Sequence, residues 1–256
     1  MAYPVLSGAE AFAFPGGDVG VLLLHGFTGS PQGLRPWGEA LRDDGHTILC
    51  PLLPGHGTHV KDLAGARAAD WIAASQAALD DLAGQCRTVV ICSLSFNSAL
   101  ALHLAATRPE QVAGLITVNA ALYHKDRRLW LLPLLKFLVA TAPGVGSDLA
   151  DSAEKELAYE QIPLKTFASA LAFQRRVRAE LPRVRQPLLC YVARQDHVVD
   201  PGCTTYLASH VAASDAQVVW LDRSYHVATL DYDRQVIFGG SLAFIRRVAG
   251  VGYRSS

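Results

Sequence analysis

Three polar residues of different types each follow closely on an apolar run of the chain. They are Ser95 after residues 87–93, Asp196 after residues 186–193, and His226 after residues 216–222. A serine hydroxyl is a weak nucleophile until a base takes its proton, and histidine is a suitable base. An aspartate would hold the imidazole tautomer and stabilise the imidazolium. Because these residue types also occur in this order by chance, the information lies in their shared position after apolar runs. The arrangement predicts nucleophilic catalysis on Ser95.

Ser95 lies where a strand-like run passes into a helix-like run, within the stretch TVVICSLSFNSALAL. Nucleophilic serines at such turns usually carry the pattern Gly-x-Ser-x-Gly. Here Ser93 and Asn97 occupy both glycine positions. Glycine is favoured there because the serine backbone is strained and the strand and helix pack closely around it. We expect the turn to form under stress, with Ser93 tolerated and the larger Asn97 displacing a neighbour. Natural divergence and engineering would both produce this pattern.

Each candidate has a competing interpretation. Ser95 has the residue type of a helix N-cap, which would give it a purely structural role. His226 would be a surface histidine if the loop around it faced solvent. Asp200 lies in the same loop as Asp196 and competes with it as the partner of His226. We favour Asp196 because it follows the apolar run more directly.

Three further histidines lie in glycine-containing loops. His56 and His59 have a spacing typical of metal ligands, but no third ligand is apparent, so we predict no metal site. The loop around Gly55 and Gly57 is interpreted as structural. His25 is expected to hold loops together by hydrogen bonds.

The elements that position these residues alternate between apolar strands and amphipathic helices. The predicted strands are residues 19–26, 46–51, 87–93, 112–120, 186–193 and 216–222. Helices are predicted between them, including one over residues 30–45 with Ser30 as N-cap and Pro31 at its first position. Near-continuous apolar strands separated by helices indicate an α/β fold with a mostly parallel sheet covered on both faces. Ligands of such sheets bind at the carboxyl ends of the strands.

Residues 121–185 interrupt this alternation. The stretch is mostly helical in pattern and contains no convincing strand, so we predict a helical cap inserted into a core of residues 1–120 and 186–256. Its apolar run from Leu129 to Pro143 is too short to span a bilayer, and we expect no stable membrane insertion. A buried or lid helix is favoured over a membrane-surface segment. The residues expected to line an apolar acyl pocket are Trp130, Leu134, Phe137 and Leu138.

The composition excludes several classes of function. The 256 residues contain 23 Lys and Arg against 23 Asp and Glu, so no basic excess points to nucleic acid. The first 14 residues do not resemble a signal peptide. Five scattered cysteines form no Cys-x-x-Cys pair, and Cys50, Cys92 and Cys190 lie in apolar runs. We interpret them as buried thiols and expect a cytoplasmic location. The sequence does not indicate an oligomeric state.

Five stretches of the chain form a combined pattern: LLLHGFTGSP, LPGHGTH, the turn around Ser95, DHVV and SYHVATLD. Together they resemble the α/β-hydrolase superfamily, and within it the small bacterial carboxylesterases and monoacylglycerol lipases. The resemblance covers nearly the whole chain and is weakest in residues 121–185. It implies an α/β-hydrolase fold and an oxyanion hole formed by the backbone N–H groups of Phe27 and Phe96. It also implies serine-dependent hydrolysis of carboxylic esters with short to medium acyl chains, or of monoacylglycerols, without metal or organic cofactor.

Two alternative functions stay open. The same acyl-enzyme would serve a thioesterase, an acyltransferase or a cyclase if the acyl group passed to another acceptor. The altered positions Ser93 and Asn97 would also suit a ligand-binding protein that has lost catalysis. Relatives that use an aspartate nucleophile, such as dehalogenases, are disfavoured because the turn holds a serine.

Overall fold

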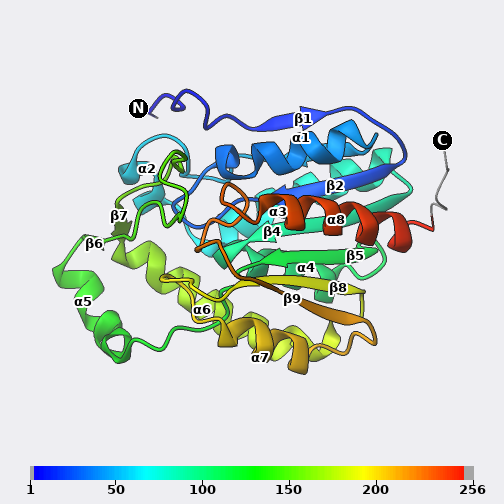
Figure 1. Cartoon of the computed structure of the whole chain (residues 1–256). Helices are drawn as coiled ribbons and strands as arrows, with labels where there is room; N and C mark the ends of the chain where they lie inside the picture. Colours follow the sequence, from blue (N-terminus) through cyan, green and yellow to red (C-terminus); the bar gives the residue numbers. More distant parts are fainter. Residues whose placement is uncertain (1–2, 251–256) are drawn as a thin grey trace.

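The central element of the fold is a seven-stranded sheet with the strand order β1-β3-β2-β4-β5-β8-β9 (Figure 1). The computed structural model describes residues 3–250. The strands are β1 (Phe12–Phe14), β2 (Val19–Leu24), β3 (Thr47–Cys50), β4 (Thr88–Leu94), β5 (Gly114–Val118), β8 (Leu188–Ala193) and β9 (Ala216–Leu221). β1 pairs antiparallel with β3, and the other pairings are parallel. The predicted α/β fold with a mostly parallel sheet is confirmed.

Side chains of β2 enter two hydrophobic cores, one on each face of the sheet. Val21 and Leu23 belong to one core, and Leu22 and Leu24 belong to the other. Successive residues of a strand point to opposite faces, so a strand covered on both sides is apolar at every position. The first core is closed by α1 (Arg35–Asp43) and α8 (Arg234–Val248). The second receives side chains from α3 (Ala68–Gln85), α4 (Ser98–Thr107), α6 (Leu164–Glu180) and α7 (Gly202–His210).

The first predicted helix begins later than its sequence suggests. A short 3-10 helix, η1 (Pro31–Leu34), precedes α1, and the Ser30 side chain makes no capping hydrogen bond. Ser30 does stand at the N-cap position, with Pro31 at the first helical position as predicted, but it caps η1 by position alone. The chain turns after α1 at Gly45, whose φ of 91° favours glycine.

Residues 121–185 lie between β5 and β8 and contain more than helices. Their elements are η3 (Arg127–Leu131), α5 (Leu132–Leu138), β6 (Thr141–Pro143), β7 (Gln161–Pro163), α6 and η4 (Leu181–Arg183). β6 and β7 form a separate antiparallel pair, so the expectation of no strand is wrong. The pair is three residues long on each side and depends on a partner 20 residues away, which local patterns do not reveal.

One helix of the inserted segment, α6, packs into the core, whereas another, α5, does not. Phe173 and Val177 of α6 are buried in the same hydrophobic cluster as α3 and α4. α5 instead lies at the outer edge of the molecule, beyond α6 (Figure 1). The division into core and cap stays a prediction, and positions 1–2 and 251–256 of the predicted core lie outside the described residues.

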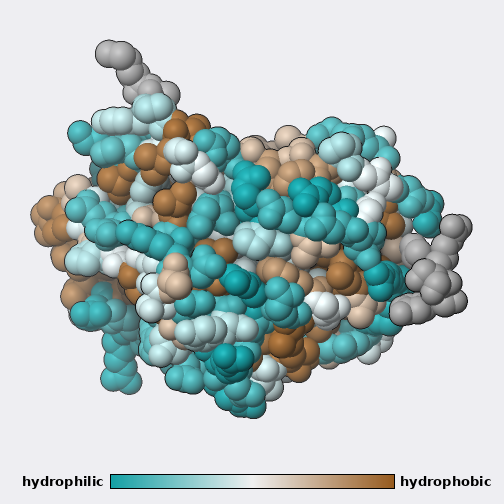
Figure 2. All heavy atoms as spheres, turned by 45° about the horizontal axis from the view of Figure 1, so that its top comes forward, coloured by the Kyte–Doolittle hydropathy of each residue, from teal (hydrophilic) through white to brown (hydrophobic). Residues whose placement is uncertain are grey.

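One group of exposed apolar residues lies at the end of the molecule where α5 lies. Hydrophobic residues reach the surface at the left end of Figure 2, the side that α5 occupies in Figure 1. Trp130, Leu134, Phe137 and Leu138 are between 62% and 76% exposed. Within residues 3–250, no helix combines the length and the hydropathy needed to cross a membrane. The two remaining helices are α2 (Val60–Gly65), after β3, and η2 (Ser95–Asn97), directly after β4.

Candidate active site

Backbone strain concentrates at one edge of the sheet. Within the described part of the chain, three non-glycine residues have positive φ: Thr28 (68°), Ser95 (59°) and Asn119 (49°). They follow β2, β4 and β5, three adjacent strands, at their carboxyl ends. Such conformations cost on the order of 1–3 kcal/mol each and persist where the surroundings enforce them, commonly at functional sites. This edge of the sheet is therefore the candidate site.

A line of hydrogen bonds joins the three residues selected from the sequence. Ser95 Oγ lies 2.8 Å from His226 Nε2. His226 Nδ1 lies 2.8 Å from Asp196 Oδ2. The other carboxylate oxygen of Asp196 accepts the N–H groups of Val198 and Val199, both at 2.8 Å. These two bonds fix the carboxylate, so that its free oxygen faces the imidazole. The structure thus brings Ser95, His226 and Asp196 together in the order needed for proton transfer.

The competing interpretations of these residues do not match the geometry. Ser95 Oγ contacts His226, and η2 has no side-chain cap. The imidazole side chain of His226 is only 10% exposed. Asp200 accepts the N–H of Gly202 and forms an ion pair with Lys125. Asp196 rather than Asp200 therefore faces the imidazole.

The electrostatic surroundings of His226 favour its protonated form. Burial works to lower the pKa of His226, but the hydrogen bond and charge of Asp196 raise it, as do the charges of Glu156 and Asp148. The net result is a pKa above the ordinary value for histidine. Asp148 also accepts the backbone N–H of His226 at 3.1 Å. The imidazole is therefore a stronger base than that of a free histidine. As the pH falls, it becomes protonated at a higher pH than a free histidine does.

Asn119 holds the loop of His226 against the sheet. Its side-chain amide donates to the carbonyl of His226 at 2.7 Å, and its amide oxygen accepts the N–H of Ala193 at 2.8 Å. One side chain thus links the ends of β5 and β8 to the histidine loop. The sequence interpretation missed Asn119, although it ends a predicted strand as the candidates do.

Asp231 performs a similar task from the other side. It is 1% exposed, and its carboxylate accepts backbone N–H groups from both the histidine loop and the inserted segment. Its donors are Tyr225, Tyr232, Ala150 and Asp151, at 2.8–3.0 Å. The motif SYHVATLD therefore ends in an acid that fixes the loop. The available sequence signal was the position of Asp231 at the end of this motif, which sequence reasoning left unused.

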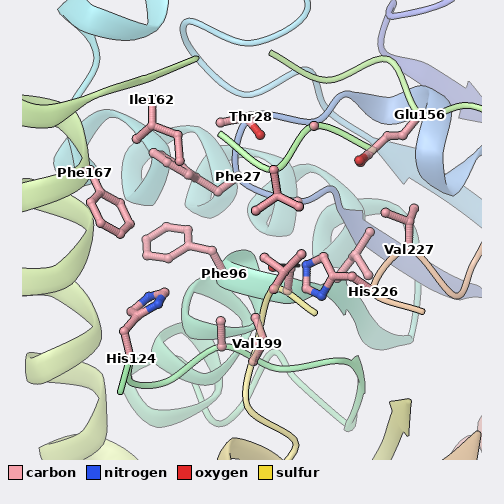
Figure 3. A pocket seen from close by; sticks show the side chains of 17 residues that line it. Phe27, Thr28, Phe96, His124, Glu156, Ile162, Phe167, Val199, His226 and Val227 are labelled. Carbon is pink, nitrogen blue, oxygen red and sulfur yellow. Dashed lines mark hydrogen bonds between the residues drawn. The ribbon is translucent and has the colours of Figure 1, made fainter. Parts of the chain in front are cut away.

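An apolar pocket of about 200 Å³ opens beside Ser95 (Figure 3). Its floor is formed by the strand ends, and its walls include Phe27, Phe96, Phe167, Ile162, Val198 and Val199. Gly26 lies beside the nucleophile turn, since a Cβ on it would lie 3.8 Å from the Cβ of Ser95, an ordinary contact distance. The rings of Phe27 and Phe96 lie 5.4 Å apart. The two predicted oxyanion donors thus belong to residues that border Ser95 from two different loops.

The predicted pocket residues of the inserted segment do not reach this pocket. Trp130, Leu134, Phe137 and Leu138 are exposed, and none of them lines the wall beside Ser95. The structure places these side chains on the outer surface of η3 and α5 instead, while α5 packs on α6. An apolar run does not reveal which way its apolar face points. The inserted segment contributes His124, Val145, Gly146, Glu156, Ile162 and Phe167 to the pocket instead.

Glu156 places a carboxyl group in this mostly apolar wall (Figure 3). Burial raises its pKa to about 7, against the opposing effect of nearby His226. A Cβ on Gly29 would lie 2.5 Å from Glu156 Oε1, so the carboxyl occupies the space that a larger residue there would fill. The sequence interpretation gave Glu156 no role, because acidic residues in loops are common and its burial is visible only in the fold.

Both altered positions of the serine turn have polar partners. Ser93 Oγ lies 3.2 Å from Ser98 Oγ. The side-chain amide of Asn97 donates to the backbone carbonyl of His25, in the loop after β2. The expectation that Asn97 displaces a neighbour stays a prediction. Asn97 crosses to a loop and forms a hydrogen bond there.

The histidines of the glycine loops serve structural roles. His25 lies 3.0 Å from the Gly26 carbonyl through Nδ1 and accepts the Leu53 N–H through Nε2. His56 Nδ1 faces the carbonyl of Leu53 at 3.3 Å. His59 caps α2 by accepting the N–H of Lys61. In the part of the chain that the structure describes, no group of three or more His, Cys, Asp or Glu side chains is arranged to hold a metal ion.

The fold and the site together define an α/β-hydrolase: a parallel sheet with a serine in a strained strand-to-helix turn, and its acid and base on later strand ends. A family model described as "Serine aminopeptidase, S33" matches residues 18–233, and the chain belongs to this family.

Two curated relatives cover almost the whole chain. The thermostable monoacylglycerol lipase of Bacillus sp. (strain H-257) is 38% identical over 97% of this chain and 98% of its own length. A carboxylesterase of Bacillus subtilis (strain 168) is 26% identical over 93% of this chain and 97% of its own. A solved structure described with LipS and LipT, two metagenome-derived lipolytic enzymes, has 38% identity and a TM-score of 0.92. That alignment covers 95% of this chain and 100% of the other. The predicted resemblance to bacterial esterases and monoacylglycerol lipases is confirmed.

Proposed function

We propose that this chain hydrolyses carboxylic esters with short to medium apolar acyl groups, monoacylglycerols among them, through an acyl-enzyme on Ser95. One observation carries the proposal: the hydrogen-bonded line Ser95–His226–Asp196 ends at an apolar pocket. The pocket volume of about 200 Å³ is small beside the roughly 300–1,000 Å³ typical of ligand sites. A short or medium acyl chain suits that volume.

The mechanism follows from the positions of the atoms. Ser95 Oγ attacks the ester carbon while His226 Nε2 takes its proton, and Asp196 stabilises the imidazolium. The carbonyl electron pair moves to oxygen, where the N–H groups of Phe27 and Phe96 bind the anion. The intermediate then expels the alcohol, which receives the proton from His226. A water molecule repeats the sequence on the acyl-enzyme and releases the carboxylic acid.

Glu156 supports a hydroxylated leaving alcohol. Its carboxyl borders the pocket on the side of His226, where the leaving group receives its proton. A carboxyl group accepts hydrogen bonds from hydroxyl groups whether or not it is ionised, and the glycerol of a monoacylglycerol retains two free hydroxyl groups. The lipase relative named for monoacylglycerols agrees with this assignment.

The test is a panel of p-nitrophenyl esters of increasing chain length, together with a monoacylglycerol, assayed on the wild type and on Ser95→Ala. We expect turnover by the wild type and a loss of at least a thousandfold in Ser95→Ala, with the fold retained. Ser209→Ala, an exposed serine of α7, is the matched control and should be unaffected. Undiminished turnover by Ser95→Ala would refute the proposal.

The same panel separates the alternatives. When an acyl thioester is supplied together with an alcohol or an amine, acyl transfer is revealed by formation of the acylated alcohol or amine. A fluorophosphonate probe that fails to label the wild type would indicate a ligand-binding protein without a reactive serine. Alanine p-nitroanilide is included because the family bears the name of an aminopeptidase. Preferential turnover of that amide would contradict the proposed substrate class.

A cytoplasmic location is likewise proposed. All five cysteines are free and buried. Free thiols are usual in reducing compartments, and disulfides are usual in secreted proteins.

A further inference from the structure

We infer that Asn97 is a positioning residue that fixes the distance between the two backbone N–H groups of the oxyanion hole. This inference rests on the proposed ester hydrolysis. The usual pattern has glycine at this position, and glycine has no side chain that could perform this role.

Asn97 connects the two loops that supply the donors. Its backbone follows Phe96, whose N–H is one donor. Its side chain donates to the carbonyl of His25, two residues before Phe27, whose N–H is the other donor. A single side chain therefore joins the turn after β4 to the loop after β2.

The loop after β2 is held from a second side by the ring of His25. Burial and the nearby His56 lower the pKa of His25 to about 3, so its ring is neutral. Nε2 accepts the Leu53 N–H at 3.2 Å, which leaves the proton on Nδ1, facing the Gly26 carbonyl. The ring thus ties this loop to the loop after β3. Asn97 supplies the link to the nucleophile turn itself.

Asn97 does not act by contacting the substrate. It is 1% exposed and does not line the pocket beside Ser95. Its φ of −75° and ψ of −1° lie in the right-handed region, so its side chain introduces no backbone strain. Its effect on catalysis must pass through the backbone of Phe96 and of residues 25–27.

An oxyanion exists only after Ser95 has attacked, so this positioning should stabilise the transition state and leave substrate binding unchanged. A misplacement of about 1 Å can cost on the order of 100-fold in rate. Restoring the usual glycine by Asn97→Gly should therefore lower kcat by about 10- to 100-fold while KM changes by less than about twofold.

The decisive measurement uses an alkyl trifluoromethyl ketone. Ser95 Oγ adds to its carbonyl carbon and gives its proton to His226, which leaves an anionic oxygen in the oxyanion hole. In Asn97→Gly its inhibition constant should rise by the factor by which kcat falls, whereas inhibition by the product butyrate should not change. Asn97→Asp preserves size but offers no donor to the carbonyl, and should show the same pattern.

Gln186→Ala is the matched control. Gln186 is also a buried amide that donates to a backbone carbonyl, that of Ala105 at 3.0 Å, but at the opposite end of α4. Its loss should reduce stability while kcat stays within about twofold of the wild type.

The outcomes separate this inference from the proposed function. An inactive wild type would refute ester hydrolysis itself. With an active wild type, an unchanged or higher kcat in Asn97→Gly would overturn the inference. A fall in kcat without a change in ketone affinity would also overturn it. If neither Asn97 variant folds, Asn97 is a folding determinant, and the inference is again overturned.

Discussion

Replacing Asp196 by asparagine tests the hydrogen-bonded line at its most constrained member. The Asp196 side chain is 1% exposed and accepts three bonds, one from His226 and two from the N–H groups of Val198 and Val199. Asparagine has nearly the same shape, but only its amide oxygen can accept a hydrogen bond, because the other terminal atom is an NH₂ donor. The loop therefore decides which end faces the imidazole.

The two possible orientations differ by two backbone hydrogen bonds. If the amide oxygen keeps both N–H partners, its NH₂ group faces His226 Nδ1, and the imidazole must carry its proton on Nε2. That tautomer cannot accept the proton of Ser95. Turning the amide over restores the tautomer but leaves two buried N–H groups facing a donor, at a cost of about 1–3 kcal/mol each. The wrong tautomer therefore dominates.

The expected loss combines this tautomer preference with the missing negative charge. Two unsatisfied donors cost roughly 2–6 kcal/mol together. A documented triad loses on the order of 10⁴-fold in kcat on this substitution, about 5.4 kcal/mol. We therefore expect Asp196→Asn to lower kcat for p-nitrophenyl butyrate by about 10³- to 10⁴-fold with little change in KM.

Asp200→Asn is the internal control for this measurement. Asp200 accepts one N–H from Gly202 and pairs with Lys125, whose side chain is 70% exposed, so its removal should alter kcat by less than about twofold. Steady-state kinetics and circular dichroism on both variants suffice. A loss below tenfold in Asp196→Asn, or a larger loss in Asp200→Asn, would refute the reasoning.

Three further predictions test the pocket. Glu156→Gln removes a negative charge that raises the pKa of His226, so the acid limb of the kcat/KM profile should move to lower pH. Gly29→Ala places a Cβ 2.5 Å from Glu156 Oε1, so this carboxyl must shift, and the free energy of unfolding in urea should fall by at most about 1 kcal/mol. Phe167→Ala should change the kcat/KM ratio between p-nitrophenyl acetate and butyrate by about tenfold, whereas Phe137→Ala, at a side chain 71% exposed, should leave it unchanged.

Each of these predictions has an outcome that contradicts it. An acid limb that stays in place or moves upward in Glu156→Gln would mean that the carboxyl does not act on His226. Gly65→Ala, at a position with open space, controls for the general effect of alanine, and equal stability changes at both glycines would remove the packing argument. Equal effects of Phe167→Ala and Phe137→Ala on chain-length preference would mean that the pocket is not the acyl site.

The sheet and its polar edge were predictable because both depend on local patterns. A strand covered on both faces, such as β2, must be apolar throughout, and that run is visible in the sequence. Ser95, Asp196 and His226 each follow such a run, so the fold brings them to one edge. These are consequences of strand order and direction, and they need no knowledge of side-chain packing.

The inserted segment was less predictable because its structure depends on distant partners. β6 and β7 pair across a long loop, and α5 packs with its apolar side chains outward. The role of Glu156 depends on burial that this segment creates only when it covers the strand ends. Hydrophobic patterning indicates that a residue is apolar, but it does not indicate which of several apolar surfaces it joins.

The serine turn shows why the glycine pattern was a poor guide to strain. The positive φ belongs to Ser95 itself, at 59°, while Asn97 lies in the right-handed region and Ser93 lies in the extended strand β4. Neither flanking position therefore requires the conformational freedom of glycine. The glycines of the usual Gly-x-Ser-x-Gly pattern instead reflect the limited space between the strand, the helix and the loop at these positions. A side chain can satisfy that limit if it leaves the contact and finds a partner, as Asn97 does at the His25 carbonyl. The strained backbone of Ser95 cannot be relieved in this way, because its positive φ sets the direction in which the hydroxyl points.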